Sequence, residues 1–285
     1  MSMEGRADAH AKVNLALRIL TRDANGYHRL ETLFQRLALA DTVVLRPTRG
    51  SRGLEVEWQG ARAVSLGPAP TNLAWRAAEG FAALTGWPAG WEIRLSKRIP
   101  AGGGLGGGSA DAAAVLRILN DLAPAPLDEV ALHALATRLG ADVPFALSGA
   151  ALALGTGYGE RLHPLPPLPS QPVSVILPDF GVNTAQAYGA LAEARQAAGG
   201  AAPLPQFTDR GFGSWAEVEA AQTNDFESVV FGRYPVLGEV RAALEAAGAR
   251  IARMSGSGST LFAVGTTAAI PLPAGWMRVE TATGV

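Results

Sequence analysis

One stretch decides the fold of this chain: Pro100-Ala101-Gly102-Gly103-Gly104-Leu105-Gly106-Gly107-Gly108-Ser109-Ala110-Asp111-Ala112-Ala113. Six of its seven residues from Gly102 to Gly108 are glycine, and the apolar spacing that follows predicts a helix from Ala110 to Leu122. Glycine lets the backbone approach a ligand closely, and the N-terminus of a helix presents free N–H groups with a partial positive charge. A glycine loop that opens directly into a helix therefore predicts a phosphate-binding site.

Other readings of the glycine loop fit less well. Gly102, Gly104 and Gly107 satisfy the dinucleotide pattern G-x-G-x-x-G, but the acidic residue about 20 positions later, Asp128, falls at a helix start instead of a strand end. A flexible linker does not usually run straight into an amphipathic helix, and so many glycines cost folding entropy if no ligand is bound. Phosphate binding remains the favoured interpretation.

Two further glycine motifs are also incomplete. A Walker A loop needs lysine after its last glycine, whereas Ser109 follows Gly108. The nucleophile elbow G-x-S-x-G needs a second glycine where this chain has Asp111.

Composition limits the class of protein. The chain has 285 residues, 48% of them hydrophobic, which suffices for one large or two modest domains. The net charge is −1 and the pI is near 6.4, so we expect no nucleic-acid partner. There is no cysteine, which excludes disulfides and thiolate metal sites, and the four histidines lack ligand spacing.

The sequence shows no targeting or membrane signal. The segment from Met1 to Ala9 has no apolar core, and no run of 18 apolar residues occurs. We therefore expect a cytoplasmic location and no membrane partner.

Hydrophobic patterning predicts a mixture of strands and helices. The alternation from Ala9 to Leu20 predicts a half-buried strand with Lys12 and Asn14 on its polar face. We expect a second strand or short helix at 27–35, further strands at 41–46, 53–58, 91–95, 173–177, 249–254 and 260–264, and further helices at 73–84, 127–139, 184–194 and 235–247. Without strict β-α-β alternation, the pattern favours an α+β fold with a boundary near 150–172.

The glycine stretch closely resembles the second motif of the GHMP kinases, a superfamily of small-molecule kinases. The chain also resembles the first motif, at Ala11-Lys12-Val13-Asn14-Leu15 with Asp23-Ala24-Asn25-Gly26-Tyr27-His28, and the third, from Arg253 to Ser259. Leu139–Phe145 and Asn224–Glu227 match the family pattern as well. Three motifs in the family's order are stronger support than any one of them.

The resemblance implies a fold and a division into domains. The implied fold is α+β, a two-domain GHMP kinase fold with the active site in the inter-domain cleft. Residues 1–155 would form the N-terminal domain with the nucleotide and catalytic motifs. Residues 156–285 would form a ferredoxin-like C-terminal domain with the substrate wall and the third motif.

The resemblance also implies the reaction, which is ATP-dependent phosphorylation of an alcohol. By this analogy residues Pro100 to Ala110 bind ATP, with Mg²⁺ as the accompanying metal. The family commonly has a second serine where this chain has Ala110, so the magnesium ligand stays open, with Ser109 as a candidate. Lys97 and Arg98 either add positive charge near the phosphates or form solvated surface.

Lys12 and Asp142 are the implied catalytic residues. Asp142 precedes a predicted helix, so its local sequence alone favours an ordinary N-cap, whereas the resemblance makes it the base that takes the acceptor's proton. We hypothesise that Lys12 lies within a hydrogen bond of Asp142 and stabilises negative charge; a solvated strand face is its structural alternative.

The implied acceptor is a small molecule with a cytidine head group. We expect cytosine to lie between Tyr27 and Tyr188, with His28 bonding the base, although a core role for Tyr188 is nearly as good. The expected substrate-binding residues are Asn14, Tyr27, His28, Thr184, Tyr188, Gly256 and Ser257. Alternatives are a GHMP kinase acting on homoserine, mevalonate or a sugar, a nucleotide-binding regulator without catalysis, and, more distantly, a nicotinamide oxidoreductase. The oligomeric state is open.

Overall fold

The computed structural model describes residues 3–24, 26–60, 64, 66–200, 203–207 and 211–284. The fold is α+β, as the sequence predicts, and the chain forms two compact units. Unit 1 contains Met1–Ala11, Leu39–Ala101 and Gly106–Gly149; unit 2 contains Lys12–Ala38, Gly102–Leu105 and Ala150–Val285. No helix among the described residues is long and apolar enough to cross a membrane.

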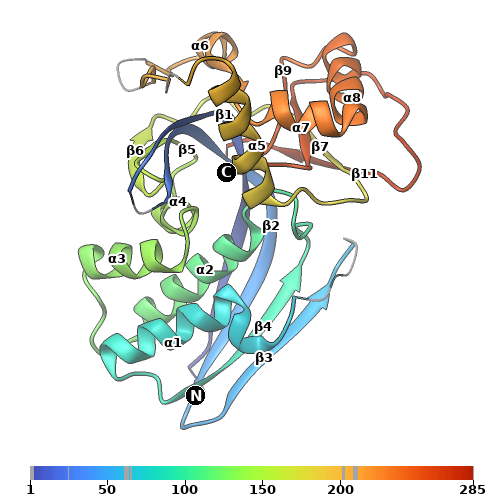
Figure 1. Cartoon of the computed structure of the whole chain (residues 1–285). Coiled ribbons are helices and arrows are strands. Elements are labelled where there is room, and N and C mark those ends of the chain that lie inside the picture. Colours follow the sequence, from blue (N-terminus) through green and yellow to red (C-terminus); the bar gives the residue numbers. More distant parts are fainter. Residues whose placement is uncertain are drawn as a thin grey trace. The chain divides into compact units, whose positions relative to one another are not determined.

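Unit 1 packs helices on one face of a sheet (Figure 1). Its strands are β3 (Arg52–Trp58), β4 (Gly90–Lys97) and the outer parts of β1 (Gly5–Arg22) and β2 (His28–Thr48), and its helices are η1 (Ala69–Thr71), α1 (Leu73–Thr85), α2 (Gly107–Leu122), α3 (Glu129–Leu139) and α4 (Val143–Ser148). β3 runs parallel to β4, and β4 runs antiparallel to β2. Apolar side chains of β2, β4, α1, α2 and α3 share one buried cluster, which fixes α2 to the sheet.

Local sequence explains where the helices of unit 1 begin. Asn72 caps α1 by accepting a hydrogen bond from Ala74 N at 2.9 Å. Asp128 caps α3 in the same way, accepting from Ala131 N at 2.8 Å, so α3 begins two residues later than predicted.

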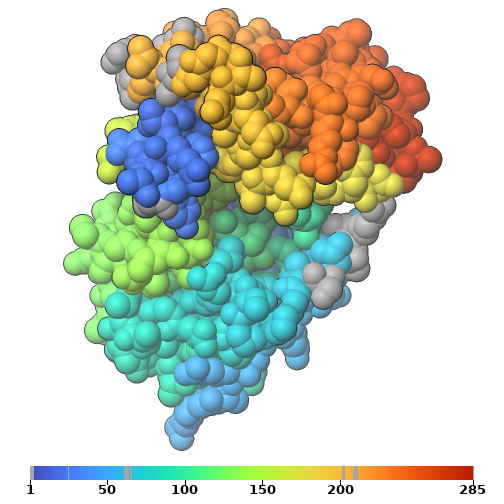
Figure 2. Space-filling view, in the orientation of Figure 1, coloured from blue at the N-terminus to red at the C-terminus, as the bar shows by residue number. Residues whose placement is uncertain are grey.

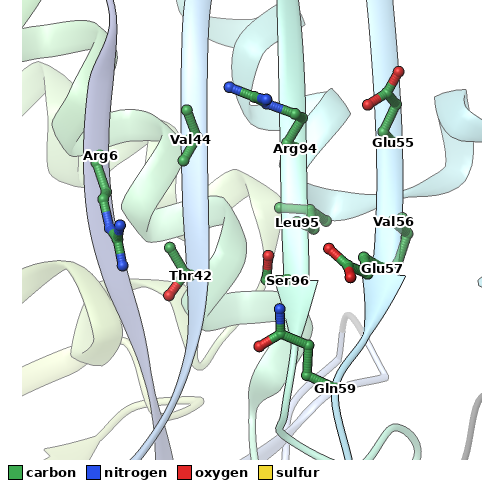
Figure 3. Close-up of a pocket in the computed structure, with 10 residues that line it drawn as sticks. All are labelled: Arg6, Thr42, Val44, Glu55, Val56, Glu57, Gln59, Arg94, Leu95 and Ser96. Atoms are coloured by element: carbon green, nitrogen blue, oxygen red, sulfur yellow. The ribbon is translucent and has the colours of Figure 1, made fainter.

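The opposite face of the unit 1 sheet is polar. Figure 3 shows side chains from four neighbouring strands around a shallow depression of about 540 Å³. Arg6 and Arg94 line it together with Glu55 and Glu57. None of the predicted site residues lines this depression, and its alternation of buried and charged positions is that of a sheet with one solvated face.

Unit 2 contains β1 from Lys12 onward, β2 up to Ala38, the tip of the glycine loop and the chain from Ala150 onward. Its other strands are β5 (Leu152–Thr156), β6 (Arg161–Leu165), β7 (Pro172–Leu177), β8 (Thr223–Asn224), β9 (Ile251–Met254), β10 (Leu261–Val264) and β11 (Met277–Ala282), and its helices are α5 (Thr184–Ala197), α6 (Trp215–Ala221), α7 (Glu227–Arg233) and α8 (Pro235–Ala246). β5 pairs with β2 and β6, while β8 pairs with β1. An antiparallel sheet in the order β11-β7-β10-β9 packs with α5, α7, α8 and two β1 residues.

Two expectations about the first strands are wrong. The segments 27–35 and 41–46 belong to one strand of 21 residues, β2, because no glycine or proline interrupts the chain between them. β1 is not half-buried throughout: every residue from Ala11 to Leu17 is buried, including those of the polar face. The division into residues 1–155 and 156–285 stays a prediction; β1 and β2 each contribute residues to both compact units.

Candidate active site

The glycine loop leads into α2 earlier than the sequence predicts. α2 begins at Gly107 instead of Ala110, and its N-cap is Gly106, whose φ of 71° is in the left-handed region. Gly107, Gly108 and Ser109 therefore form the first turn, where backbone N–H groups have no intrahelical acceptor. Gly106 supplies no side-chain cap, which leaves these donors for an anion.

The tip of the loop, Gly102–Leu105, belongs to unit 2 and allows no side chain at two positions. A Cβ on Gly103 would lie 2.1 Å from Thr260 Oγ1, and one on Gly104 would lie 2.4 Å from Ser255 O. Ser255 Oγ also donates to Gly104 O at 2.9 Å. The second and third family motifs are thus in direct contact through Gly104 and Ser255.

Lys12 and Asn14 lie inside unit 2. Lys12 Nζ donates to Asn14 Oδ1 at 2.8 Å, and Asn14 Nδ2 donates to Thr32 Oγ1 at 2.7 Å. Thr32 Oγ1 in turn donates to Ala16 O at 2.9 Å. Lys12 is only 6% exposed, so the interpretation of a solvated strand face is wrong. Thr32, which sequence reasoning did not single out, orients this buried chain of hydrogen bonds.

Asp142 stands at the start of α4, as predicted, but it does not cap that helix with its side chain. Its backbone is in the right-handed helical region, at φ −86° and ψ −13°, and its exposure is intermediate. The interpretation of an ordinary N-cap is therefore wrong. Asp142 belongs to unit 1 and Lys12 to unit 2, and the predicted hydrogen bond between them stays a prediction.

His28 and Tyr188 lie together on unit 2. Their rings stack with centroids 4.8 Å apart and planes at 21°, while Tyr188 meets Phe226 edge-on, also at 4.8 Å. Burial, with the nearby charges of Arg22 and Arg195, lowers the pKa of His28 below its ordinary value of 6.5, which favours the neutral imidazole. Figure 2 shows the β1–β2 turn and α5, which carry these rings, side by side.

Tyr27 contacts the ring of Tyr158. Its side chain is 67% exposed and its ring is 5.7 Å from that of Tyr158, on the β5–β6 turn. Tyr158 Oη donates to Asp23 Oδ2 at 2.8 Å, and this hydrogen bond and the Arg29 guanidinium lower the pKa of Asp23. Tyr158 therefore supports the predicted substrate turn, although nothing in its local sequence marked it. Asn25, in the same motif, lies outside the described residues.

The third motif forms a loop between β9 and β10. The Thr184 and Ser257 hydroxyls are 2.9 Å apart, which joins this loop to the start of α5. Asn224 Nδ2 donates to Met254 O at 2.7 Å and to Gly256 O at 2.8 Å. Asn224 lies in a stretch that the family pattern picked out without a role, and the structure makes it a support of the Gly256 loop.

Lys97 lies between two carboxylates. It is 3% exposed, and its Nζ bonds both Asp41 and Asp111, the latter at 2.6 Å. Burial, together with the charge of Asp41 and against the attraction of Lys97, raises the pKa of Asp111 to about 7. The interpretation of Lys97 as solvated surface is wrong, because the side chain is buried between two carboxylates. Added positive charge near the phosphates stays a prediction.

Comparison with known proteins gives consistent matches over most of the chain. The model of the GHMP kinases N terminal domain matches residues 72–150, and that of the GHMP kinases C terminal matches residues 204–270. The 4-diphosphocytidyl-2-C-methyl-D-erythritol kinase of Geobacter sulfurreducens is 43% identical over 90% of this chain and 88% of its own. That of Pelotomaculum thermopropionicum is 40% identical over 89% and 86%.

Solved structures give the same result. The crystal structure of a 4-(cytidine 5'-diphospho)-2C-methyl-D-erythritol kinase matches with a TM-score of 0.75 and 37% identity, covering 99% of this chain and 100% of that one. Homoserine kinase from Cytophaga hutchinsonii shares the fold, with a TM-score of 0.66 at 20% identity over 100% and 96% of the two chains. The chain therefore belongs to the GHMP kinases and, within them, to the 4-diphosphocytidyl-2-C-methyl-D-erythritol kinase family.

Proposed function

We propose that this chain transfers the γ-phosphoryl group of ATP to the 2-hydroxyl of 4-diphosphocytidyl-2-C-methyl-D-erythritol, giving the 2-phosphate and ADP in the non-mevalonate route to isoprenoid precursors. The observation that carries the proposal is the glycine loop: its tip admits no side chain at Gly103 or Gly104, and it opens directly into α2. Family membership supplies the acceptor.

ATP is proposed to bind along residues Pro100 to Ala110. The first-turn N–H groups of Gly107, Gly108 and Ser109, together with the positive end of α2, favour phosphate oxygens there. Gly103 and Gly104 have no room for a side chain because Thr260 and Ser255 occupy the space that a Cβ would need, which holds the tip of the loop close to the third motif.

The donor set of the chain fits a magnesium ion held mostly by ATP phosphates and water. The described residues contain no group of three His, Asp or Glu side chains suited to a metal, and Mg²⁺ in kinases commonly takes only one or two protein ligands. Ser109, in the first turn of α2, is the residue proposed to contribute one of them. Such an ion, when bound, neutralises charge on the phosphates.

The acceptor hydroxyl must lose a proton as the phosphoryl group arrives. We assign this step to Asp142, whose carboxylate does not cap α4. Lys12 is proposed as the cation that stabilises negative charge, with its ammonium oriented by Asn14. Catalysis of phosphoryl transfer otherwise rests on positioning and charge neutralisation.

The cytidine head group is proposed to bind at Tyr27, His28 and Tyr188. A neutral imidazole can accept from the amino group of cytosine and donate to a ring acceptor, so the lowered pKa of His28 suits this role. Because His28 covers one face of Tyr188, we propose that cytosine displaces the imidazole and lies between Tyr27 and Tyr188. Asn14, Thr184, Gly256 and Ser257 complete the proposed substrate contacts.

The wider setting follows from the same proposal. We infer that residues 1–155 carry the nucleotide and catalytic motifs and that residues 156–285 carry the substrate wall and the third motif. The partner is a small molecule, and we expect the protein to act in the cytoplasm.

The product tests the proposal. Incubation with Mg-ATP and the cytidylated acceptor should give one new phosphomonoester signal in the phosphorus NMR spectrum, coupled to the tertiary carbon C2. A phosphomonoester at a different carbon, or ADP release without any phosphomonoester, would overturn it.

A further inference from the structure

A buried ionic cluster of three side chains lies in unit 1 beneath the first turns of α2. Lys97, the last residue of β4, bonds Asp41 of β2 and Asp111 of α2, the latter at 2.6 Å. The three residues are 3%, 0% and 2% exposed, respectively. Enclosing three charged groups is costly, so the cluster calls for a reason beyond stability.

The cluster holds the chain on both sides of the glycine loop. Asp41 Oδ1 accepts hydrogen bonds from Arg98 N at 2.5 Å and from Ile99 N at 2.8 Å, immediately before the loop begins. Asp111 lies four residues after Gly107, where α2 begins, and binds the same lysine. One lysine thus joins the strand that enters the loop to the helix that leaves it.

Close packing at Gly107 shows how tightly the two ends are drawn together. A Cβ on Gly107 would lie 3.0 Å from Ile99 Cγ2 and 3.5 Å from Lys97 Nζ. The first turn of α2 therefore rests directly on the end of β4, and its height above the sheet is set by Lys97 and Ile99.

The charge of the cluster argues against a direct role at the phosphates. One ammonium faces two carboxylates, so the cluster presents no net positive charge to an anion. The ammonium also takes the place between the carboxylates that a divalent cation would need. We therefore consider the cluster for its effect on the conformation of the glycine loop.

The loop needs such control because glycine gives up more conformational freedom on ordering than any other residue. A loop that is competent for only a fraction of the time binds its ligand more weakly by that same fraction. We propose that Lys97, Asp41 and Asp111 are positioning residues that fix both ends of the glycine loop in the conformation that binds ATP phosphates. This proposal rests on the proposed binding of ATP by the loop.

Two substitutions at Asp111 separate positioning from bulk stability. Asp111→Asn keeps an oxygen that can accept a hydrogen bond from Lys97, whereas Asp111→Leu keeps the branched shape and removes the bond to Lys97. Both variants leave the Lys97–Asp41 pair intact. In folded Asp111→Leu we expect faster hydrogen exchange in the peptide from Arg98 to Ser109 and about a tenfold higher KM for ATP, which a loop competent one tenth of the time would give. The KM for the acceptor should stay at its wild-type value. Asp111→Asn should show wild-type hydrogen exchange in this peptide and a wild-type KM for ATP.

The control is the double variant Arg46→Met/Glu92→Leu, which removes an exposed ion pair between the same strands, β2 and β4. It should leave loop exchange and the KM for ATP unchanged. If Asp111→Leu does not fold, Asp41→Asn carries the test, because one amide oxygen cannot serve Lys97, Arg98 N and Ile99 N together.

The outcomes distinguish this proposal from the proposed function. Wild-type loop exchange and wild-type ADP affinity by titration calorimetry in a folded Asp111→Leu or Asp41→Asn variant would overturn the positioning role, even if the enzyme is active. Absence of turnover in the wild type would instead overturn the proposed function, while faster loop exchange and weaker ADP binding in the variants would still support the cluster.

Discussion

Lys12 shows at the residue scale how much of the site depends on burial. Its ammonium is held by Asn14, which is itself held by Thr32, and all three side chains are buried. A buried cation held by a fixed partner has few rotamers left, so little order must be gained when a substrate arrives. Both faces of β1 are buried around this lysine, from Ala11 to Leu17.

Asp142 gives the most direct prediction at this scale. Asp142→Asn keeps the shape of the side chain and removes its ability to accept a proton, so kcat should fall by about 100-fold to 10,000-fold. Nucleotide affinity, measured by calorimetry with ADP, should be unchanged.

The matched control is Asp128→Asn, because Asp128 also stands before a helix, α3, and caps it. Asparagine caps as well as aspartate, so this variant should keep both activity and stability. Wild-type kcat in Asp142→Asn would refute the assignment of the base.

His28 gives a prediction about selectivity. His28→Ala removes a stacking partner of Tyr188 and the proposed hydrogen bonds to cytosine, so the acceptor KM should rise about tenfold or more, the effect of losing roughly 1.4 kcal/mol. The KM for ATP should change far less, which steady-state kinetics with each substrate varied in turn would measure.

His163→Ala is the control for this experiment, since His163 lies exposed on β6. It should leave both KM values at their wild-type levels. A rise of equal size in both KM values for His28→Ala would contradict the proposed recognition of cytosine by His28.

At the scale of elements, the glycine loop separates two effects of an added side chain. Gly102 and Gly104 both have positive φ, 78° and 76°, but a Cβ meets nothing within 4 Å at Gly102 and lies 2.4 Å from Ser255 O at Gly104. Gly102→Ala should cost roughly 1–2 kcal/mol of unfolding free energy from left-handed strain alone. Gly104→Ala should cost roughly 1–3 kcal/mol more from overpacking, or shift the loop.

Urea unfolding and the KM for ATP would be measured for both variants. We expect a small change in the KM for ATP in Gly102→Ala and a large one in Gly104→Ala. Equal stability of the two variants would contradict the contact between the second and third motifs.

α7 carries a prediction about pH. Burial raises the pKa of Glu227 above its ordinary value of 4.5, although its hydrogen bond from Met254 N and the charges of Arg253 and Arg241 act the other way. The folded state therefore holds this proton more tightly than the unfolded state does. This proton's contribution to the free energy of unfolding is complete below the pKa that Glu227 has in the unfolded state. The contribution is lost as pH rises through the pKa that Glu227 has in the folded state.

Glu227→Gln keeps an acceptor for Met254 N and does not titrate. Between pH 4.5 and neutrality, wild type should lose unfolding free energy relative to this variant, as urea titrations at several pH values would show. Glu239→Gln, at an exposed position of α8, should follow the wild type. A difference that does not grow with pH would contradict the account.

The elements themselves were largely predictable, because their periods are local. The helices α1, α5 and α8 begin at or within a residue of the predicted positions, where Asn72, Asn183 and Pro235 give clear start signals. The sequence predicts two segments where the structure has the single strand β2, because the pairing of β2 with β4 and β5 is not local.

The site was predictable in its residues and not in its contacts. Motif order identified the glycine loop, but nothing in the sequence joins Lys97 to Asp41, 56 residues earlier, or Asn224 to the backbone of Gly256. Such partners come from strands that pair only in the folded chain. The same reason hid Tyr158, which meets the Tyr27 turn across 131 positions of sequence.

For the whole molecule, the order of motifs and the order of compact units differ. β1 and β2 run through both units, and the glycine loop begins and ends in unit 1 while its tip belongs to unit 2. The nucleotide and substrate motifs are therefore carried by segments that alternate between the units along the chain. Family membership links this arrangement to the 4-diphosphocytidyl-2-C-methyl-D-erythritol kinases.

The most direct test of the central claim is a coupled ADP-release assay with Mg-ATP and three acceptors in parallel: 4-diphosphocytidyl-2-C-methyl-D-erythritol, mevalonate and homoserine. We expect turnover with the cytidylated acceptor alone. Turnover with mevalonate or homoserine would contradict the roles given to Tyr27, His28 and Tyr188, and ATP binding without turnover of any acceptor would contradict the assignment of the chain as a kinase.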